Sequence, residues 1–192
     1  MKALVIGATG ATGKDLVTQL LSDPDFKEVD VFVRKPVPIQ NPKLKTHIVD
    51  FEKPDEWKDL VKGDVAFSCL GTTLKTAGSK EAQRKVDYDY QYNFAKSARE
   101  NNVEDYVLVS SYGADSKSKI FYSKMKGDLE QSVKALHFNK ITIFQPGMLE
   151  RKDTERMGEV LGGKIIKLAN KLGMFKSQKP LPTKVLAKAM IN

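Results

Sequence analysis

The chain opens with Met1-Lys-Ala-Leu-Val-Ile-Gly7-Ala-Thr-Gly10-Ala-Thr-Gly13, an apolar run that leads into three glycines spaced three residues apart. Such a run indicates a buried strand, and glycines at this spacing are typical of a turn that leads into a helix. Gly7 would allow the sharp bend, Gly10 would let a pyrophosphate approach the backbone, and Gly13 would let the helix pack on the strand. The helix N-terminus then offers free N–H groups to the anion. The predicted cofactor-binding residues of this segment are Gly7, Thr9, Gly10, Ala11, Thr12 and Gly13. Because the spacing is GxxGxxG and not the commoner GxGxxG, an ordinary glycine-rich turn is the alternative.

Length and composition indicate a globular protein with one core. The 192 residues suit a single domain, and a charged content of 29% is ordinary for such a protein. The net charge is +8, but acidic residues are interspersed among the basic ones, which favours a solvated surface over a nucleic-acid-binding one. No stretch approaches the ~20 apolar residues that span a bilayer. We therefore expect no nucleic-acid or membrane partner, and a monomer or homodimer.

Cysteine usage and the start of the chain bear on its location. Cys69 is the single cysteine, so no intrachain disulfide can form, which fits a reducing compartment. The first apolar run is too short for a signal peptide. From these two features we expect a cytoplasmic protein.

Apolar runs alternate with helical patterns along the chain, which predicts an α/β protein: a three-layer Rossmann fold with a doubly wound parallel sheet and helices on both faces. The expected buried strands are Ala3–Ile6, Val29–Val33, Thr46–Val49, Val65–Cys69, Tyr106–Ser110 and Ile141–Gln145. The expected helices are Thr12–Leu21, Pro54–Val61, Ser79–Asn101, Phe121–Leu136, Met157–Leu172 and Lys184–Met190. Residues 1–192 form one dinucleotide-binding domain in this interpretation, and residues 148–192 contribute a cover over the substrate cleft. Within that cover, Lys164–Lys171 is basic and amphipathic, so a membrane-surface helix is the alternative.

The ends of the second and third strands predict which dinucleotide binds. An acidic residue after the second strand typically binds the ribose of NAD, whereas an arginine accommodates the 2′-phosphate of NADP. Here Arg34 and Lys35 follow Val33, which favours NADP(H). Asp50 and Phe51 end the third strand, where a carboxylate can bind the adenine amino group and a ring can flank the base. For Arg34 and Lys35, the alternative is that they belong to a basic surface loop. For Asp50, the alternative is that it caps the N-terminus of the helix that begins at Pro54.

Two Tyr-x-x-x-Lys pairs occur, and their context separates them. Tyr92 and Lys96 lie in the middle of a long predicted helix, whereas Tyr122 and Lys126 open the helix after the fifth strand. Ser110 and Ser111 end that strand, at the carboxyl edge where ligands of open α/β sheets bind. A serine hydroxyl can orient a carbonyl, and a tyrosine whose phenolate is favoured by a neighbouring ammonium can exchange a proton with it. This set predicts reduction of a ketone or aldehyde, with a half-buried aromatic at a helix start as the alternative for Tyr122.

Longer motifs resemble the atypical branch of the short-chain dehydrogenase/reductase superfamily that contains the Tat-interacting-protein-like oxidoreductases. These motifs are Gly7–Gly13, Ser68–Thr73, Lys85–Tyr90, Ser110–Asp115, Tyr122–Glu130 and Gln145–Met148. The resemblance implies that Leu70, Gly71 and Thr72 line the cofactor and that Pro146 and Gly147 lie beside the nicotinamide. It further implies that Tyr122 is the acid/base and that Lys126 holds the ribose hydroxyls. Ser111 is the preferred catalytic serine, and Ser110 the alternative. Ser110, Tyr122 and Lys126 are also predicted to contact the cofactor.

The expected activity is NADPH-dependent reduction of a small carbonyl compound by Ser111, Tyr122 and Lys126. The rival is a regulatory protein that binds NADP(H) without turnover, and an intact Ser/Tyr/Lys set favours the enzyme. A sugar-nucleotide epimerase or dehydratase is a weaker alternative, because the region after Met148 is short for a lobe that holds a nucleotide sugar. The two histidines, His47 and His137, form no metal-binding spacing, so no metal is expected.

Overall fold

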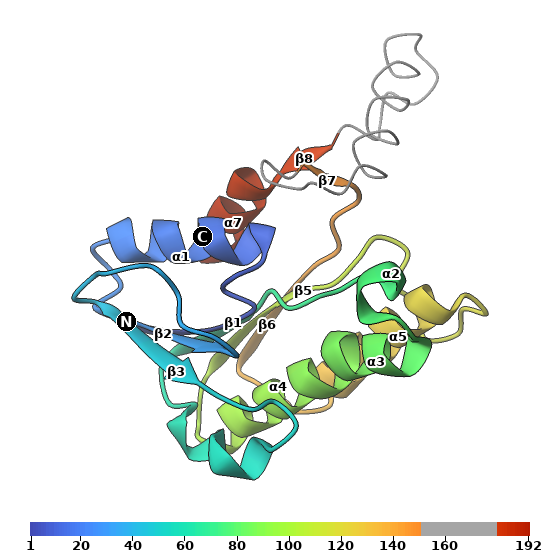
Figure 1. Cartoon of the computed structure of the whole chain (residues 1–192), viewed down its shortest axis with the longest axis horizontal. Coiled ribbons are helices and arrows are strands. Elements are labelled where there is room, and N and C mark those ends of the chain that lie inside the picture. Colours follow the sequence, from blue (N-terminus) through green and yellow to red (C-terminus); the bar gives the residue numbers. More distant parts are fainter. Residues whose placement is uncertain (151–179) are drawn as a thin grey trace, which may run out of the picture.

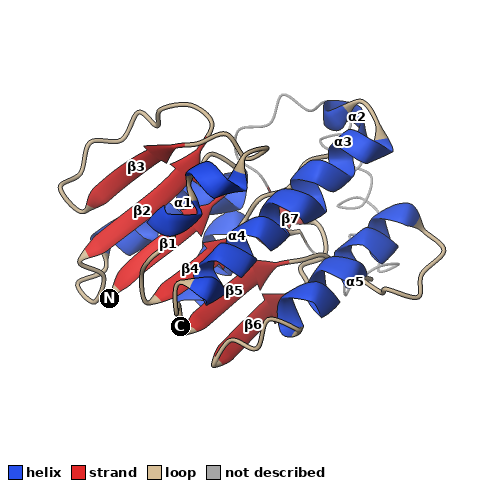
Figure 2. Cartoon of the chain, turned by 90° about the horizontal axis from the view of Figure 1, so that it is seen from below, coloured by secondary structure: helices blue, strands red, loops and turns tan. Residues whose placement is uncertain are grey.

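The computed structural model describes residues 1–150 and 180–192, and its main feature is one sheet of six parallel strands (Figure 1). The strands are β1 (Lys2–Ile6), β2 (Glu28–Val33), β3 (Leu44–Ile48), β4 (Val65–Ser68), β5 (Asp105–Val109) and β6 (Lys140–Phe144). Their order in the sheet is β3-β2-β1-β4-β5-β6, which Figure 2 shows in full. This is the doubly wound order of a Rossmann fold. The predicted fold class is confirmed.

Helices cover both faces of the sheet. They are α1 (Ala11–Ser22), α2 (Leu74–Ala77), α3 (Lys80–Arg84), α4 (Tyr90–Glu100), α5 (Phe121–Lys134) and α7 (Thr183–Ile191). Figure 1 shows α1 and α7 on one face and α3, α4 and α5 on the other. A short parallel pair, β7 (Leu149–Glu150) and β8 (Leu181–Pro182), lies apart from the main sheet. Residues 1–150 and 180–192 therefore form one three-layer α/β domain.

Two apolar cores lie on opposite faces of the sheet, because its central strands are buried on both sides. In β1, Leu4 and Ile6 face one core, and Ala3 and Val5 face the other. All four side chains are fully buried, which explains why this strand is a continuous apolar run without alternation. Strand β3 differs, since it lies at the edge and Lys45 and Thr46 are exposed. The expectation that this strand is buried was wrong, because among the described residues β3 has a neighbouring strand on one side only.

The predicted helix Ser79–Asn101 is broken. It begins as expected, with the Ser79 hydroxyl accepting a hydrogen bond from the Ala82 N–H at 3.1 Å. The chain then passes from α3 through a π-helical turn over Lys85–Asp89 into α4. The predicted helix Pro54–Val61 is likewise two short 3₁₀ turns. In both segments the side-chain pattern is helical, but the backbone winds more loosely or more tightly than an α-helix.

The C-terminal predictions are confirmed in part. Helix α7 corresponds to the predicted Lys184–Met190 and packs against α1, where Gln19 donates to the Lys184 carbonyl at 3.0 Å. The predicted helix Met157–Leu172, with its amphipathic stretch Lys164–Lys171, lies outside the described residues. Among residues 1–150 and 180–192, no helix has both the length and the apolar character that crossing a membrane requires. In the same part of the chain, no three potential metal ligands of the His, Cys, Asp and Glu types are grouped.

His47 is expected to contribute to the stability of the fold, because it pairs with the buried carboxylate of Asp30. Asp30 is 1% exposed, and its Oδ2 atom lies 2.6 Å from His47 Nε2 and 3.1 Å from Lys2 Nζ. The His47 ring also stacks on Phe32 at 4.8 Å between centroids. We expect His47→Ala to lower the free energy of unfolding by about 2–4 kcal/mol, since it leaves a buried charge with one partner fewer. Urea denaturation measures this, with the exposed Lys45→Ala on the same strand as control. Equal midpoints for the two variants would contradict the prediction.

Candidate active site

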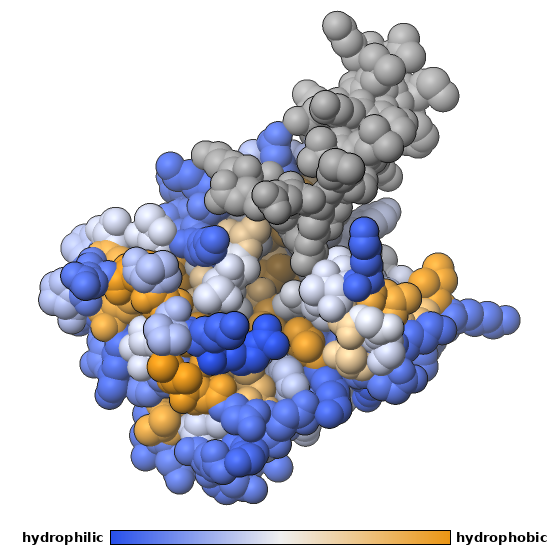
Figure 3. Space-filling model, viewed as in Figure 1, coloured by the Kyte–Doolittle hydropathy of each residue, from blue (hydrophilic) through white to orange (hydrophobic). Residues whose placement is uncertain are grey.

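A cavity of about 400 Å³ lies at the carboxyl edge of the sheet, next to the point between β1 and β4 where the strand order reverses. Ligands of open α/β sheets bind at this switch point. Its lining residues are Thr9, Gly10, Ala11, Thr12, Lys14, Asp15, Cys69, Leu70, Gly71, Thr72, Asp87, Val109, Ser110, Tyr122, Lys126, Leu149 and Thr183. Figure 3 shows apolar surface recessed between the two helical layers on this face. The site thus joins the glycine-rich loop to the segments after β4 and β5.

The glycine-rich loop is bent and tightly packed. Gly7 has φ +83°, a conformation that other residues rarely adopt. A Cβ on Gly13 would lie 2.1 Å from the Gly7 carbonyl oxygen, so only glycine fits there. Gly10 lines the cavity and is the N-cap of α1, whose first turn receives no side-chain cap. The N–H groups of the first turn of α1 are therefore available to bind an anion, and a side chain at Gly10 would occupy the space that a pyrophosphate needs.

Tyr122 and Lys126 reach the same cavity from α5. The Tyr122 side chain is 37% exposed, whereas that of Lys126 is only 3% exposed. Lys126 Nζ lies 3.2 Å from Oδ1 of Asp87, a carboxylate that is 1% exposed. Burial raises the pKa of the Asp87 carboxyl, while the Lys126 charge and the Thr72 N–H act in the opposite direction. Both residues of the predicted catalytic pair therefore line this cavity, and Lys126 has a buried counter-charge.

The two candidate serines have different surroundings. Ser110 is buried, lines the cavity and donates its hydroxyl hydrogen to Glu130. Glu130 lies one turn beyond Lys126 on α5 and also accepts from Gln145 Nε2 at 2.9 Å. Ser111 does not line the cavity, and its hydroxyl lies 3.4 Å from the Tyr112 carbonyl oxygen. Ser110 thus lines the cavity, but its hydroxyl hydrogen is donated to a buried carboxylate. Ser111 lies outside the cavity lining, and its hydroxyl makes a longer hydrogen bond, to a backbone carbonyl.

The predicted adenosine contacts lie beyond this cavity. Arg34 and Lys35 are exposed after β2, and Asp50 is exposed after β3, where its Oδ1 accepts from the Glu52 N–H at 3.0 Å. Asp50 therefore caps a turn of its own segment and not the 3₁₀ turn at Pro54, which has no side-chain cap. Phe51 is 4% exposed, and its ring packs against Trp57 and Tyr90. Its contact with the adenine base stays a prediction.

Tyr90 lies beside these residues at the same end of the site. Its ring stacks on Phe51 at 5.4 Å between centroids. Burial and a hydrogen bond to Glu52 raise the pKa of the Tyr90 phenol to about 12, and the charges of Arg34 and Asp50 also act on this side chain. The charged groups of Arg34 and Asp50 therefore both lie close enough to the Tyr90 phenol to affect its pKa.

The segments after β4 and β6 differ in how they meet the cavity. Leu70, Gly71 and Thr72 line it, as the resemblance implied for cofactor contacts. Pro146 and Gly147 do not line it, but the Pro146 carbonyl accepts from the Tyr112 N–H at 2.9 Å, which joins the loops after β5 and β6.

Several lining residues were missed from sequence. Asp15 and Thr183 are joined by a 2.6 Å hydrogen bond between Oδ2 and Oγ1, which ties α1 to the start of α7. No local pattern pairs residues so far apart in the chain. Cys69 lines the cavity wall, and burial raises the pKa of its thiol to about 12, which disfavours a reactive thiolate.

Comparison with known proteins decides the family. A family model described as NAD(P)H-binding matches residues 7–167. The chain belongs to this NAD(P)H-binding family. Protein HTATIP2 of Rattus norvegicus is 34% identical over 194 residues, covering 98% of this chain and 78% of the rat protein. The mitochondrial protein FMP52 of Coccidioides immitis is 36% identical over 176 residues, covering 82% of this chain and 72% of the fungal one. These relatives make the chain an atypical short-chain dehydrogenase/reductase, as the motifs implied.

Solved structures of other proteins share the fold of this chain. A short-chain dehydrogenase from Burkholderia cenocepacia in complex with NADP superimposes with a TM-score of 0.69 at 14% identity, covering 99% of this chain and 82% of that chain. UDP-glucose 4-epimerase of Thermotoga maritima gives a TM-score of 0.69 at 13% identity, covering 87% of this chain. The chain spans only 63% of the epimerase and 54% of MoeE5, another matched structure. At these identities the likeness shows the shared fold alone.

The expected cytoplasmic location was wrong. The FMP52 relatives from Coccidioides immitis, Candida albicans, Eremothecium gossypii and Saccharomyces cerevisiae are all named as mitochondrial proteins. The expectation rested on a single cysteine and on the lack of a signal-peptide pattern. A cysteine count reports redox conditions and not the compartment that provides them.

Proposed function

We propose that this protein is an NADPH-dependent oxidoreductase that reduces a small carbonyl compound. The observation that carries the proposal is that Tyr122 and Lys126 line the same cavity as the glycine-rich loop. A cofactor that lay on the loop would therefore extend past both side chains. The rival hypothesis is a protein that binds NADP(H) without turnover.

The residues around the cavity fit a dinucleotide. The uncapped first turn of α1 would bind the pyrophosphate, and Gly10 leaves room for it. Lys126 would hold the ribose hydroxyls, and the loop Leu70–Thr72 would form the opposite wall. When bound, NADPH would supply the reducing equivalent to the carbonyl carbon.

In this proposal Tyr122 gives its phenolic proton to the carbonyl oxygen as negative charge develops there. The nearby Lys126 ammonium stabilises the phenolate that remains. A serine hydroxyl orients the carbonyl and stabilises its charge. We assign this role to Ser111, because the hydrogen of the Ser110 hydroxyl is already donated to the buried Glu130.

The proposal is tested by following NADPH oxidation with a panel of aldehydes, diketones and quinones. We expect turnover of at least one class by the wild-type protein. Tight binding of NADPH without turnover of any class would favour the regulatory rival.

The two serines give a further prediction within the same assay. Ser111→Ala should lower turnover by about 10²-fold, the size of effect that loss of one oxyanion donor produces. Ser110→Ala is the matched control, which should cost less turnover, since it removes a partner of Glu130 and not the donor to substrate. A larger loss for Ser110→Ala would reverse the assignment.

Cofactor preference gives another prediction. We expect NADPH to bind more tightly than NADH, because Arg34 and no acid follows β2. Arg34→Ala should remove most of this preference, on the order of 1–3 kcal/mol for a charge-assisted contact. Titration with both nucleotides measures it, with Lys62→Ala, an exposed residue before β4, as control. Equal or tighter binding of NADH by the wild type would contradict the role of Arg34.

A further inference from the structure

Asp87 is a buried carboxylate that no sequence motif singled out. It lies in the π-helical turn Lys85–Asp89, and its side chain is 1% exposed while lining the cavity. Its neighbours in the turn, Tyr88 and Asp89, are half-buried and do not line the cavity. A π-helical turn inserts an extra residue into a helix, and such turns are frequent at functional sites. Here the turn brings one acidic side chain into the cavity.

The two carboxylate oxygens of Asp87 join different parts of the site. Oδ2 accepts a hydrogen bond from the Thr72 N–H at 2.9 Å, which anchors the loop after β4. Oδ1 lies 3.2 Å from Lys126 Nζ on α5 and accepts no other hydrogen bond within the described chain. We propose that Asp87 is a positioning residue that keeps the buried Lys126 ammonium charged and fixes it relative to the cofactor loop. This inference rests on the proposed function, because it assigns Lys126 to the bound nucleotide.

The charge of Lys126 depends on this one carboxylate. An ammonium group that is 3% exposed is strongly disfavoured without a counter-charge. The other titratable groups lining the cavity are Lys14, Asp15, Cys69 and Tyr122. Asp15 accepts from Thr183, and Glu130, one turn along α5, accepts from Ser110 and Gln145. Within residues 1–150 and 180–192, Asp87 is the carboxylate that lies within ion-pair distance of Lys126.

Two substitutions separate the roles of Asp87. Asp87→Asn keeps an oxygen for the Thr72 N–H and removes the charge, whereas Asp87→Ala removes both. Asp89→Asn is the matched control, since Asp89 has the same residue type in the same turn but does not line the cavity. A purely structural role would make Asn a full substitute for Asp.

The test measures the NADPH dissociation constant and the turnover rate from pH 6 to pH 10. In Asp87→Asn the ammonium of Lys126 has no counter-charge, so NADPH affinity should fall with rising pH until it levels off at the value for the neutral lysine, and the alkaline limb of turnover should lie at least ~1 pH unit lower than in the wild type. Asp87→Ala should in addition bind NADPH more weakly at every pH, and Asp89→Asn should match the wild type. Identical pH profiles for Asp87→Asn and the wild type would overturn the inference.

A stability cycle covers the case in which Asp87→Asn folds poorly. If the pair is an ion pair, Asp87→Asn and Lys126→Met should each lower the unfolding temperature, and the double variant should be more stable than additivity predicts. Strictly additive losses would overturn the inference. If the wild type binds NADPH but turns over no carbonyl compound, the proposed function fails, whereas the binding profile and the stability cycle still decide the role of Asp87.

Discussion

Tyr122→Phe is expected to lower turnover by about 10²–10⁴-fold, the range that loss of a general acid produces. The phenol is the proton donor to the carbonyl oxygen in this account, and phenylalanine keeps the ring while removing the proton. NADPH affinity should stay close to that of the wild type, because Lys126, and not the phenol, is assigned to the ribose. Steady-state rates with a carbonyl substrate and a separate NADPH titration measure the two effects.

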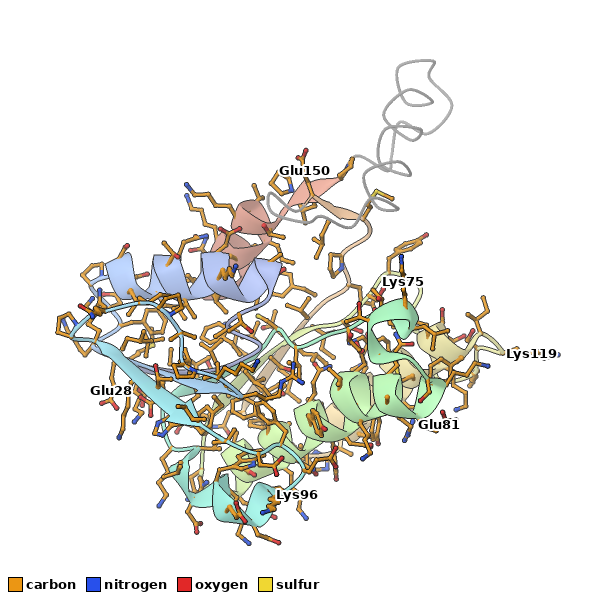
Figure 4. All side chains as sticks on the ribbon, in the orientation of Figure 1. Glu28, Lys75, Glu81, Lys96, Lys119 and Glu150 are labelled. Carbon is orange, nitrogen blue, oxygen red and sulfur yellow. The ribbon has the colours of Figure 1, made fainter. Side chains whose placement is uncertain are left out.

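Tyr92→Phe is the matched control, since Tyr92 and Lys96 have the same spacing as the catalytic pair. Tyr92 lies on α4, where its ring stacks on Tyr88 at 6.0 Å between centroids. Lys96 is on the outer surface of that helical layer (Figure 4) and lies 3.8 Å from Glu100. We expect Tyr92→Phe to keep both turnover and binding. Full activity of Tyr122→Phe on a true substrate would show that another group donates the proton.

Gly10→Val should abolish NADPH binding and leave the protein folded. The backbone at Gly10 has φ −75°, which valine adopts without strain, and the nearest atom to an added Cβ is the Gly7 oxygen at 3.3 Å. The branched side chain would instead fill the cavity where the pyrophosphate would lie. Nucleotide titration and the unfolding temperature of the same sample separate loss of binding from loss of fold.

Gly10→Ala provides the graded comparison, because it adds only the Cβ atom at the same place. Its affinity should lie between those of the wild type and Gly10→Val. Unchanged affinity in a folded Gly10→Val protein would mean that the nucleotide lies elsewhere.

The sequence predicts the sheet well because the buried central strands consist almost entirely of apolar residues. Leu4, Ile6 and their neighbours are apolar on both faces, so each central strand appears as a short uninterrupted run. The glycine loop was equally clear, since the positive φ of Gly7 and the close packing at Gly13 leave little choice of residue. The edge strand β3 was misjudged, because exposure depends on what lies beside a strand and not on the strand itself.

The sequence predicts those residues of the candidate site that lie at a regular spacing on one helix, but not the contacts between residues that are far apart in the chain. Tyr122 and Lys126 share a helix face, and their approach to the glycine loop follows from the sheet order. The Lys126–Asp87 and Ser110–Glu130 contacts join residues 39 and 20 positions apart, and no periodicity relates them. Asp87 in particular reaches the cavity through a π-helical turn that the side-chain pattern of an ordinary helix concealed.

A crystal structure of the protein with bound NADPH tests the central claim most directly. We predict that the pyrophosphate lies on the first turn of α1 beside Gly10, that Lys126 Nζ contacts the ribose hydroxyls, and that the nicotinamide ring lies next to the Tyr122 hydroxyl. A nucleotide bound outside this cavity, or one whose nicotinamide ring lies away from Tyr122, would contradict the proposed reductase site.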